Sequence, residues 1–177
     1  EYKVMHNYTI LSGKEVSDHV YRNLQDRVEL LFENNIRPGL AAVLVGENPA
    51  SKIYIKMKTK KFHNLGLKTE TFKLSVDCSQ EELIQVIEKI NNDSSFHGIL
   101  VQLPLPNHID SKSIINSICP KKDVDGFHPE NVGLLSIGSP RFIPCTPKGV
   151  MRIFEYYKIS LSGKHVVVLG RSNIVGR

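Results

Sequence analysis

Hydrophobic and polar residues alternate along the first part of the chain with the period of an α-helix. Between residues 14 and 34, apolar side chains recur every three or four positions, with polar residues between them. This spacing places the apolar side chains on one face and predicts an amphipathic helix. Pro38 and Gly39 follow it and predict a break. The apolar positions of this helix are Val16, Val20, Leu24, Val28 and Leu31.

Short apolar runs then alternate with further helical patterns. Leu40 to Val45 is an uninterrupted apolar run, which is typical of a strand buried on both faces. Asn48 followed by Pro49 predicts the start of a helix, because asparagine caps the first turn and proline at the first helical position loses no hydrogen bond. We expect this helix to run to about Leu65, with Gly66 as its left-handed C-terminal cap.

The middle of the chain continues the alternation. Residues 68–74 predict a second strand, and Ser79 with Glu82 forms a capping box before the next helix. Residues 98–102 predict a third strand, which ends at Leu103-Pro104-Leu105-Pro106 because proline lacks the donor that a strand interior needs.

The last part of the chain is less periodic. Residues 120–147 are rich in Gly, Pro, Asp and Asn, which predicts loops and short helical turns. Thr146-Pro147 begins another helix, and the Val-rich residues 165–169 predict a buried strand that ends at Gly170. Strands that alternate with helices favour an α/β fold with a mostly parallel sheet.

The composition narrows the class of protein. The 177 residues exceed the roughly 100–150 residues of a usual single domain, so we expect one complete domain and part of a second. Hydrophobic residues make up 41% of the chain, yet no apolar run approaches the ~18 residues of a membrane span. Residues 1–12 lack the pattern of a secretory signal.

The net charge and the cysteines narrow the class of protein further. The net charge is +5, but Lys and Arg are spread over the whole length, which favours an ordinary solvated surface over a nucleic-acid-binding stripe. Cys78, Cys119 and Cys145 are odd in number, far apart and without metal-binding spacing, which argues against disulfides and a metal site. A reducing compartment fits this pattern, and we expect the cytoplasm, with the mitochondrial matrix as the alternative.

The first candidate for chemistry is the pair Tyr54 and Lys58 on the helix that begins at Asn48-Pro49. Their spacing places both side chains on one helix face, about 6 Å apart along the axis. A tyrosine ring can stack on a flat heterocycle, and a lysine whose charge is disfavoured by burial can exchange protons near neutral pH. The alternative is a chance pair on a solvated helix surface.

Two further candidates lie at the end of a predicted strand and in a segment expected to be a loop. Gln102 stands at the end of the third predicted strand, where ligands bind in open α/β sheets, although the segment is equally suited to be a rigid strand exit. Asp125 follows Asp123 and Val124 and precedes Gly126. A carboxylate can accept two hydrogen bonds from an amidine-like N–H pair, whereas the alternative is an Asp side chain that caps its own turn.

The end of the chain has the pattern of a nucleotide-binding turn. Gly170, Ser172 and Gly176 follow the predicted strand in the order GxSxxxG, so the middle glycine of GxGxxG is replaced. A buried strand and a glycine-bearing turn begin a dinucleotide-binding unit, with a helix N-terminus directed at the phosphates. Arg171 beside the turn is suited to pair with the 2′-phosphate of NADP.

Six segments in one order carry a resemblance to a known family. They are VGENPAS, YxxxK (Tyr54 and Lys58), GILVQLPLP, KDVDGF, PCTPKG and GRSNIVGR. In this order they resemble the signature segments of the bifunctional methylenetetrahydrofolate dehydrogenase/methenyltetrahydrofolate cyclohydrolase family, from Ile10 onward. The resemblance implies a folate-binding catalytic three-layer α/β domain over residues 1–147. It also implies that residues 148–177 are a linking helix and the first strand and turn of a truncated Rossmann-like NAD(P)-binding domain.

The resemblance further implies a reaction and roles for residues. The reaction is oxidation of 5,10-methylenetetrahydrofolate with NADP, or alternatively NAD, and hydrolysis of the methenyl product to 10-formyltetrahydrofolate, in a cleft between the two domains. Tyr54 then stacks on the folate, Lys58 transfers protons, Gln102 adjusts that lysine, and Asp125 binds the pterin. The other substrate-binding candidates are Leu103 and Pro104, with Ser51 and Lys148 as lesser ones. The cofactor-binding candidates are Gly170, Arg171, Ser172, Ile174 and Gly176.

The sequence also indicates which partners the protein binds and which other protein classes have to be considered. The resemblance implies a small-molecule folate partner, a role in one-carbon metabolism and purine biosynthesis, and a homodimer, without nucleic acid, membrane or metal. A short-chain dehydrogenase also uses a Tyr-x-x-x-Lys pair, but its glycine-rich turn precedes the pair, whereas Gly170 follows Tyr54 here. A folate- or nucleotide-binding regulatory module without turnover is the rival from another class, and the joint presence of Lys58, Gln102 and Asp125 disfavours it.

Overall fold

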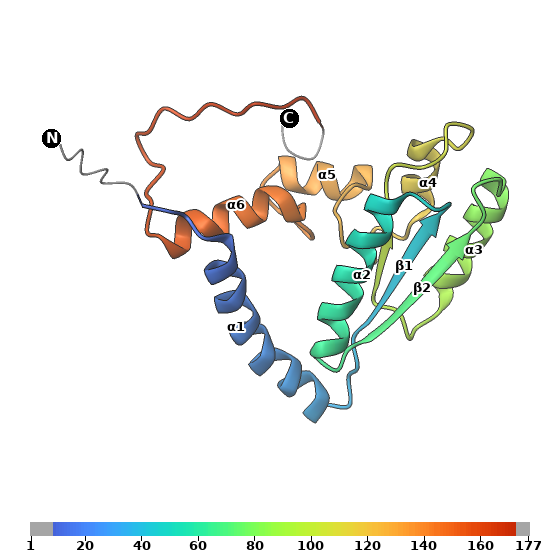
Figure 1. Ribbon diagram of the computed structural model, residues 1–177, viewed down its shortest axis with the longest axis horizontal. Helices are drawn as coiled ribbons and strands as arrows, with labels where there is room; N and C mark the ends of the chain where they lie inside the picture. The colour runs from blue at the N-terminus through green and yellow to red at the C-terminus, as the bar shows by residue number, and fades with distance from the viewer. Residues whose placement is uncertain (1–8, 173–177) are drawn as a thin grey trace, which may run out of the picture. The chain divides into compact units, whose positions relative to one another are not determined.

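Residues 9–172 are the part of the chain that the computed structural model describes, and they form six α-helices and three β-strands (Figure 1). Their contacts divide the chain into two compact units, one of residues Val28–Pro144 and the other of residues Glu1–Arg27 with Cys145–Arg177. The helices are α1 (Gly13–Glu33), α2 (Pro49–Asn64), α3 (Gln80–Asn92), α4 (Ser111–Ser117), α5 (Pro129–Ser136) and α6 (Cys145–Tyr156). The strands are β1 (Gly39–Val45), β2 (Lys68–Leu74) and β3 (Gly98–Val101).

The Val28–Pro144 unit is built on a parallel sheet in the order β2-β1-β3. The central strand β1 is buried at every position, as its uninterrupted apolar run predicts. Its odd-numbered residues from Ala41 to Val45 pack with α3 and α4, while its even-numbered residues from Leu40 to Leu44 pack with α2. Helix α2 therefore covers one face of the sheet and α3 covers the other (Figure 1). The expected three-layer α/β fold with a parallel sheet is confirmed.

The predicted helix ends are confirmed by their hydrogen bonds. The Asn48 side-chain oxygen accepts the backbone N–H of Ser51 at 3.1 Å, and proline occupies the first turn of α2. Gly66 follows that helix with a φ of 70°, the left-handed conformation that favours glycine. At α3, Ser79 accepts the N–H of Glu82 at 3.1 Å while the Glu82 carboxylate accepts the N–H of Ser79 at 2.7 Å. These local contacts fix where β1 passes into α2 and where β2 passes into α3.

The prediction of a buried strand at residues 165–169 is wrong. This segment forms neither strand nor helix, and Val167 and Leu169 are 70% and 94% exposed. A strand needs a neighbouring strand to accept and donate its backbone hydrogen bonds. Among residues 145–172 the structure has no such neighbour. The Val-rich sequence therefore favours a strand, but the described residues of this unit provide no strand for it to pair with.

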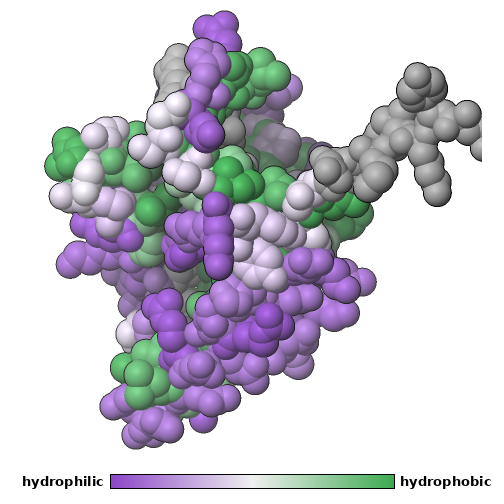
Figure 2. All heavy atoms as spheres, turned by 90° about the vertical axis from the view of Figure 1, so that its left-hand side faces the viewer, coloured by the Kyte–Doolittle hydropathy of each residue, from purple (hydrophilic) through white to green (hydrophobic). Residues whose placement is uncertain are grey.

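The described residues can be searched for membrane-spanning helices, metal-binding groups and disulfides. None of the helices within residues 9–172 combines the length and the apolar character needed to cross a bilayer. In the same range, His, Cys, Asp and Glu side chains form no group of three or more suited to a metal ion. The three cysteines form no disulfide with one another. On the face that Figure 2 shows, hydrophilic side chains predominate and hydrophobic ones form smaller groups.

Candidate active site

Helix α2 presents Tyr54 and Lys58 on its exposed side. Between them Ile55 turns inward and is 5% exposed, packed on the sheet with the β1 side chains. Tyr54 is 59% exposed and Lys58 is also exposed. Because α2 begins directly after β1 ends, its first turns lie at the carboxyl edge of the parallel sheet. Tyr54 therefore lies near the edge where open α/β sheets bind ligands, and Lys58 lies one turn further along the helix.

Gln102 lies at the same edge, at the end of β3. Its backbone N–H donates to the carbonyl of Val43 at 2.9 Å, which fixes its main chain to the central strand. Its side-chain amide N–H donates to the Leu103 carbonyl at 2.8 Å. The amide oxygen is buried and receives no hydrogen bond among the described residues. An acceptor in this state is suited to a donor from a ligand or another side chain. The adjacent Leu103 is half-buried, the Leu103-Pro104 peptide is cis, and Pro104 is exposed.

The segment that carries Asp125 runs alongside β3. Asp123 forms an isolated parallel bridge with Ile99, and the Ile99 N–H donates to the Lys122 carbonyl at 2.7 Å. Because the bridge is parallel, Asp125 lies further toward the carboxyl edge, in the direction of Gln102. Val124 packs on the sheet face that α2 covers. These two contacts bring Asp125 next to α2.

The charge of Lys58 acts on Asp125. The pKa of the Asp125 carboxyl is raised to about 6: burial is the main cause, the Lys58 ammonium opposes it, and the neighbouring Asp123 carboxylate adds to it. A carboxyl group with this pKa changes its charge close to neutral pH. The candidates Lys58 and Asp125, which are far apart in the sequence, thus lie close enough in the fold for their charges to interact.

The turn-capping alternative applies to Asp123 rather than to Asp125. The Asp123 side chain is 2% exposed and accepts the backbone N–H groups of Gly126 at 3.1 Å and His128 at 2.8 Å. It also accepts the side-chain N–H of the fully buried Asn131 at 2.8 Å. Sequence reasoning missed Asp123 and Asn131 as parts of the site. The signal for Asp123 was present, since two acids separated by one apolar residue before glycine provide one carboxylate for the turn and one for a ligand.

The remaining candidates are on α2, on α6 and among the last residues of the chain. Ser51 is buried at the first turn of α2 and 3% exposed. Lys148 is exposed on α6, in the other compact unit. The cofactor candidates Gly170, Arg171 and Ser172 are exposed in a segment without regular structure. Ile174 and Gly176 lie outside the described residues.

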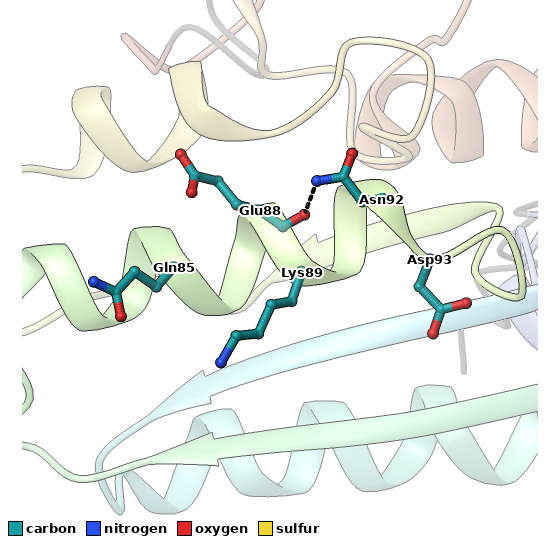
Figure 3. Close-up of a pocket in the computed structure, with 5 residues that line it drawn as sticks. All are labelled: Gln85, Glu88, Lys89, Asn92 and Asp93. Atoms are coloured by element: carbon teal, nitrogen blue, oxygen red, sulfur yellow. Dashed lines mark hydrogen bonds between the residues drawn. The ribbon is translucent and has the colours of Figure 1, made fainter.

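Two surface hollows differ from the candidate site. One is lined by five exposed side chains of α3 and its C-terminal cap, where the Asn92 side chain donates to the Glu88 carbonyl at 2.9 Å (Figure 3). The other, of about 840 Å³, lies between α1 and α6 in the second compact unit and includes Lys148. Neither hollow contains Lys58, Gln102 or Asp125. The hollow in Figure 3 is lined by Gln85, Glu88, Lys89, Asn92 and Asp93.

Comparison with known families gives two matches that together span most of the chain. Residues 11–125 match the catalytic domain of tetrahydrofolate dehydrogenase/cyclohydrolase. Residues 144–177 match the NAD(P)-binding domain of the same family.

Individual relatives give the same result. The chain is 52% identical over 169 residues to the bifunctional protein FolD of Enterococcus faecalis, which covers 96% of this chain and 60% of that protein. It is 53% identical over 169 residues to FolD of Streptococcus agalactiae serotype Ia, over 95% of this chain and 60% of that protein. The chain thus spans about 60% of the length of these curated relatives.

Solved structures agree with the fold. The crystal structure of FolD, the methylenetetrahydrofolate dehydrogenase/cyclohydrolase of Campylobacter jejuni, is similar with a TM-score of 0.92 and 47% identity, over 95% of this chain and 60% of that one. The Trypanosoma brucei FolD, solved with NADP and an inhibitor, is similar with a TM-score of 0.90 and 34% identity, over 95% of this chain and 58% of that one.

Proposed function

Because the chain belongs to the tetrahydrofolate dehydrogenase/cyclohydrolase family, we propose that it forms the folate-binding part of a bifunctional enzyme. The enzyme oxidises 5,10-methylenetetrahydrofolate to the 5,10-methenyl form with NADP and hydrolyses that product to 10-formyltetrahydrofolate. This places it in one-carbon metabolism, upstream of reactions such as those of purine biosynthesis. The observation that carries the proposal is that the buried Asp125 carboxyl feels the charge of Lys58, while the buried amide oxygen of Gln102 receives no hydrogen bond from the described residues.

Each side chain has a role that follows from its chemistry. Asp125 in its ionised form accepts two hydrogen bonds from the 2-amino group and ring N–H of the pterin. Tyr54 offers an exposed ring, one helical turn from Lys58, for stacking on the substrate. Leu103 and Pro104 border the same edge as further substrate contacts.

Lys58 is the proton-transfer group of the second activity. Hydrolysis of the methenyl group requires a proton to leave the attacking water and a proton to reach the departing nitrogen. The Lys58 amine exchanges these protons, and Gln102 adjusts its position and charge state through the free amide oxygen. The first activity needs orientation more than proton transfer, since the folate nitrogen stabilises the cation that hydride departure leaves. The two activities therefore depend unequally on Lys58.

The cofactor segment fits a phosphate by the chemistry of its donors. Arg171 is exposed, and its guanidinium is always charged and presents paired N–H donors to a phosphate. Arg171 and Ser172 would hold the 2′-phosphate of NADP, with Gly170 shaping the turn, and Ile174 and Gly176 are the further cofactor-binding candidates. The nicotinamide, when bound, accepts the hydride. NAD is the alternative cofactor.

The organisation of the whole enzyme belongs to the same proposal. Residues 1–147 form the folate-binding domain and residues 148–177 begin the NAD(P)-binding domain, with the substrate in the cleft between them. The enzyme works as a homodimer in the cytoplasm. The family matches on either side of residue 144 support the division into two domains.

An absorbance assay tests this function. The protein is expressed from the complete reading frame that contains this sequence and is mixed with methylenetetrahydrofolate and NADP or NAD. Growth of NADPH absorbance reports the oxidation, and decay of added methenyltetrahydrofolate reports the hydrolysis. Absence of both signals, from protein that is folded by circular dichroism, contradicts the proposed function.

A further inference from the structure

We propose that Asp123 is a positioning residue of this site: its buried carboxylate holds the turn of residues 123–128 in the conformation that keeps Asp125 near α2 and within reach of the Lys58 charge. The inference rests on the proposed function of the site, but it concerns a residue to which that function gives no role.

The first argument is the number of donors that one buried carboxylate accepts. One Asp123 oxygen accepts the N–H of Gly126, and the other accepts the N–H of His128 and the side-chain N–H of Asn131. A carboxylate 2% exposed needs such donors, because an ion without them is strongly destabilised away from water. Each of the three bonds closes a loop of the chain that contains Asp125, because Asp125 lies between Asp123 and Gly126 in the sequence. The position of Asp125 is therefore set by the bonds of its neighbour.

The second argument is that this carboxylate is the inner end of a longer network, which runs through the buried Asn131 to Arg141 and Glu130 at the surface. Asn131 also donates to the Pro120 carbonyl at 2.8 Å, and its oxygen accepts the Arg141 guanidinium at 2.9 Å. Arg141 pairs in turn with Glu130 at 2.7 Å. Contacts from both ends of the segment thus converge on Asp123. A network in which every member is paired holds one conformation better than single contacts do.

The third argument is the attachment of the segment to the sheet. Asp123 bridges to Ile99 of β3, and Lys122 donates to the carbonyls of Ile90 and Asp93 at the end of α3 at 3.0 and 2.8 Å. Gly98 completes the fit, because a Cβ there would lie 2.5 Å from the Val124 side chain. The strand, the helix end and the buried carboxylate together hold the residues that precede Asp125 against the sheet.

Two charged side chains act on the Asp125 carboxyl. Lys58 from α2 favours its ionised form, and Asp123 from the same turn disfavours it. Asp123 thereby raises the pKa of Asp125 at the same time as it fixes its position.

The test uses the substitution Asp123→Asn in the complete protein. An amide of the same size cannot accept all three donors, because one of its two polar atoms is itself a donor. We expect the KM for methylenetetrahydrofolate to rise tenfold or more while the KM for NADP changes less than twofold. Asp110→Asn is the matched control, since Asp110 accepts the backbone N–H groups of Lys112 and Ser113 at α4 and lies outside the site.

A double-mutant cycle separates positioning from general stability. In an Asp125→Asn background, adding Asp123→Asn should change the folate KM by less than twofold, because Asp123 acts through Asp125. If the full tenfold effect persists in that background, Asp123 does not act through Asp125 and the inference is overturned. If Asp123→Asn does not fold, Arg141→Ala decides, since it removes only the outer end of the network: an unchanged folate KM overturns the inference and a raised one supports it.

Hydrogen exchange distinguishes failure of this inference from failure of the proposed function. The amides of Gly126 and His128 should exchange slowly in the unsubstituted protein and at least tenfold faster in Asp123→Asn, whether or not the protein turns over folate. An inactive protein that shows this difference contradicts the proposed function and leaves the structural role of Asp123 supported. Equal exchange in the two proteins contradicts the role of Asp123, whatever the activity.

Discussion

Replacing Asp125 by asparagine should make the protein more stable at neutral pH while it weakens folate binding. Burial raises the pKa of this carboxyl from its ordinary value of 3.8 to about 6 in the folded chain. The folded state therefore prefers the protonated acid, and this preference contributes stability that is present below pH 3.8 and lost as the pH rises through about 6. The pKa difference corresponds to about 3 kcal/mol of destabilisation by the ionised group at pH 7 and above, taken as an upper value. Asparagine cannot ionise, so Asp125→Asn avoids this cost.

Urea unfolding followed by circular dichroism at several pH values measures the effect. The free energy of unfolding of Asp125→Asn should exceed that of the unsubstituted protein by about 1–3 kcal/mol at pH 7.5, and the difference should vanish near pH 4. The matched control is Asp26→Asn, which removes an exposed carboxylate of α1 and should change the free energy of unfolding by less than about 0.5 kcal/mol. If Asp125→Asn has the same stability as the unsubstituted protein from pH 4 to 8, the carboxyl is not held in a buried environment and the account of the site is wrong.

Three further predictions address proton transfer, packing and local capping. Lys58→Met should abolish cyclohydrolase activity and leave part of the dehydrogenase activity; equal loss of both in folded protein would refute the unequal roles. Gly98→Ala should destabilise the protein by about 1–3 kcal/mol and raise the folate KM, because its Cβ meets Val124 at 2.5 Å, whereas Gly133→Ala, with nothing within 4 Å, should do neither in thermal unfolding and kinetic assays. Ser79→Ala should cost about 1 kcal/mol of stability in urea unfolding without changing kcat, and a loss of kcat would show that the start of α3 affects the site.

Local signals predicted the elements of the Val28–Pro144 unit well. The caps at Asn48 and Ser79 and the left-handed Gly66 depend on contacts between residues at most a few positions apart, which a sequence displays directly. The buried run of β1 could be predicted for a similar reason, since a strand covered on both faces shows no polar alternation. Helix α4 was not expected, because its seven residues contain no apolar stripe long enough to show a period.

Long-range contacts account for what the sequence did not predict. The apolar residues 165–169 favour a strand, but pairing depends on a partner that the preference does not reveal. The sequence separated Lys58 from Asp125 by more than sixty positions, and only the family resemblance suggested that they belong together. The role of Asn131 was missed because a buried amide looks the same in sequence as an exposed one. Its burial becomes apparent only when Pro120, Asp123 and Arg141 surround it.

The parallel bridge between Ile99 and Asp123 limits which insertions and deletions residues 123–125 can tolerate. Along residues 123–125 the side chains turn successively to the interior network, to the sheet and to the ligand side. Inserting or deleting one residue here would place a carboxylate against Leu40 and Leu100 and move a valine to the ligand side. The number of residues in this short stretch is therefore constrained as strictly as their identity, so related proteins should differ in length at exposed loops such as the one around Asn107, and keep this one unchanged.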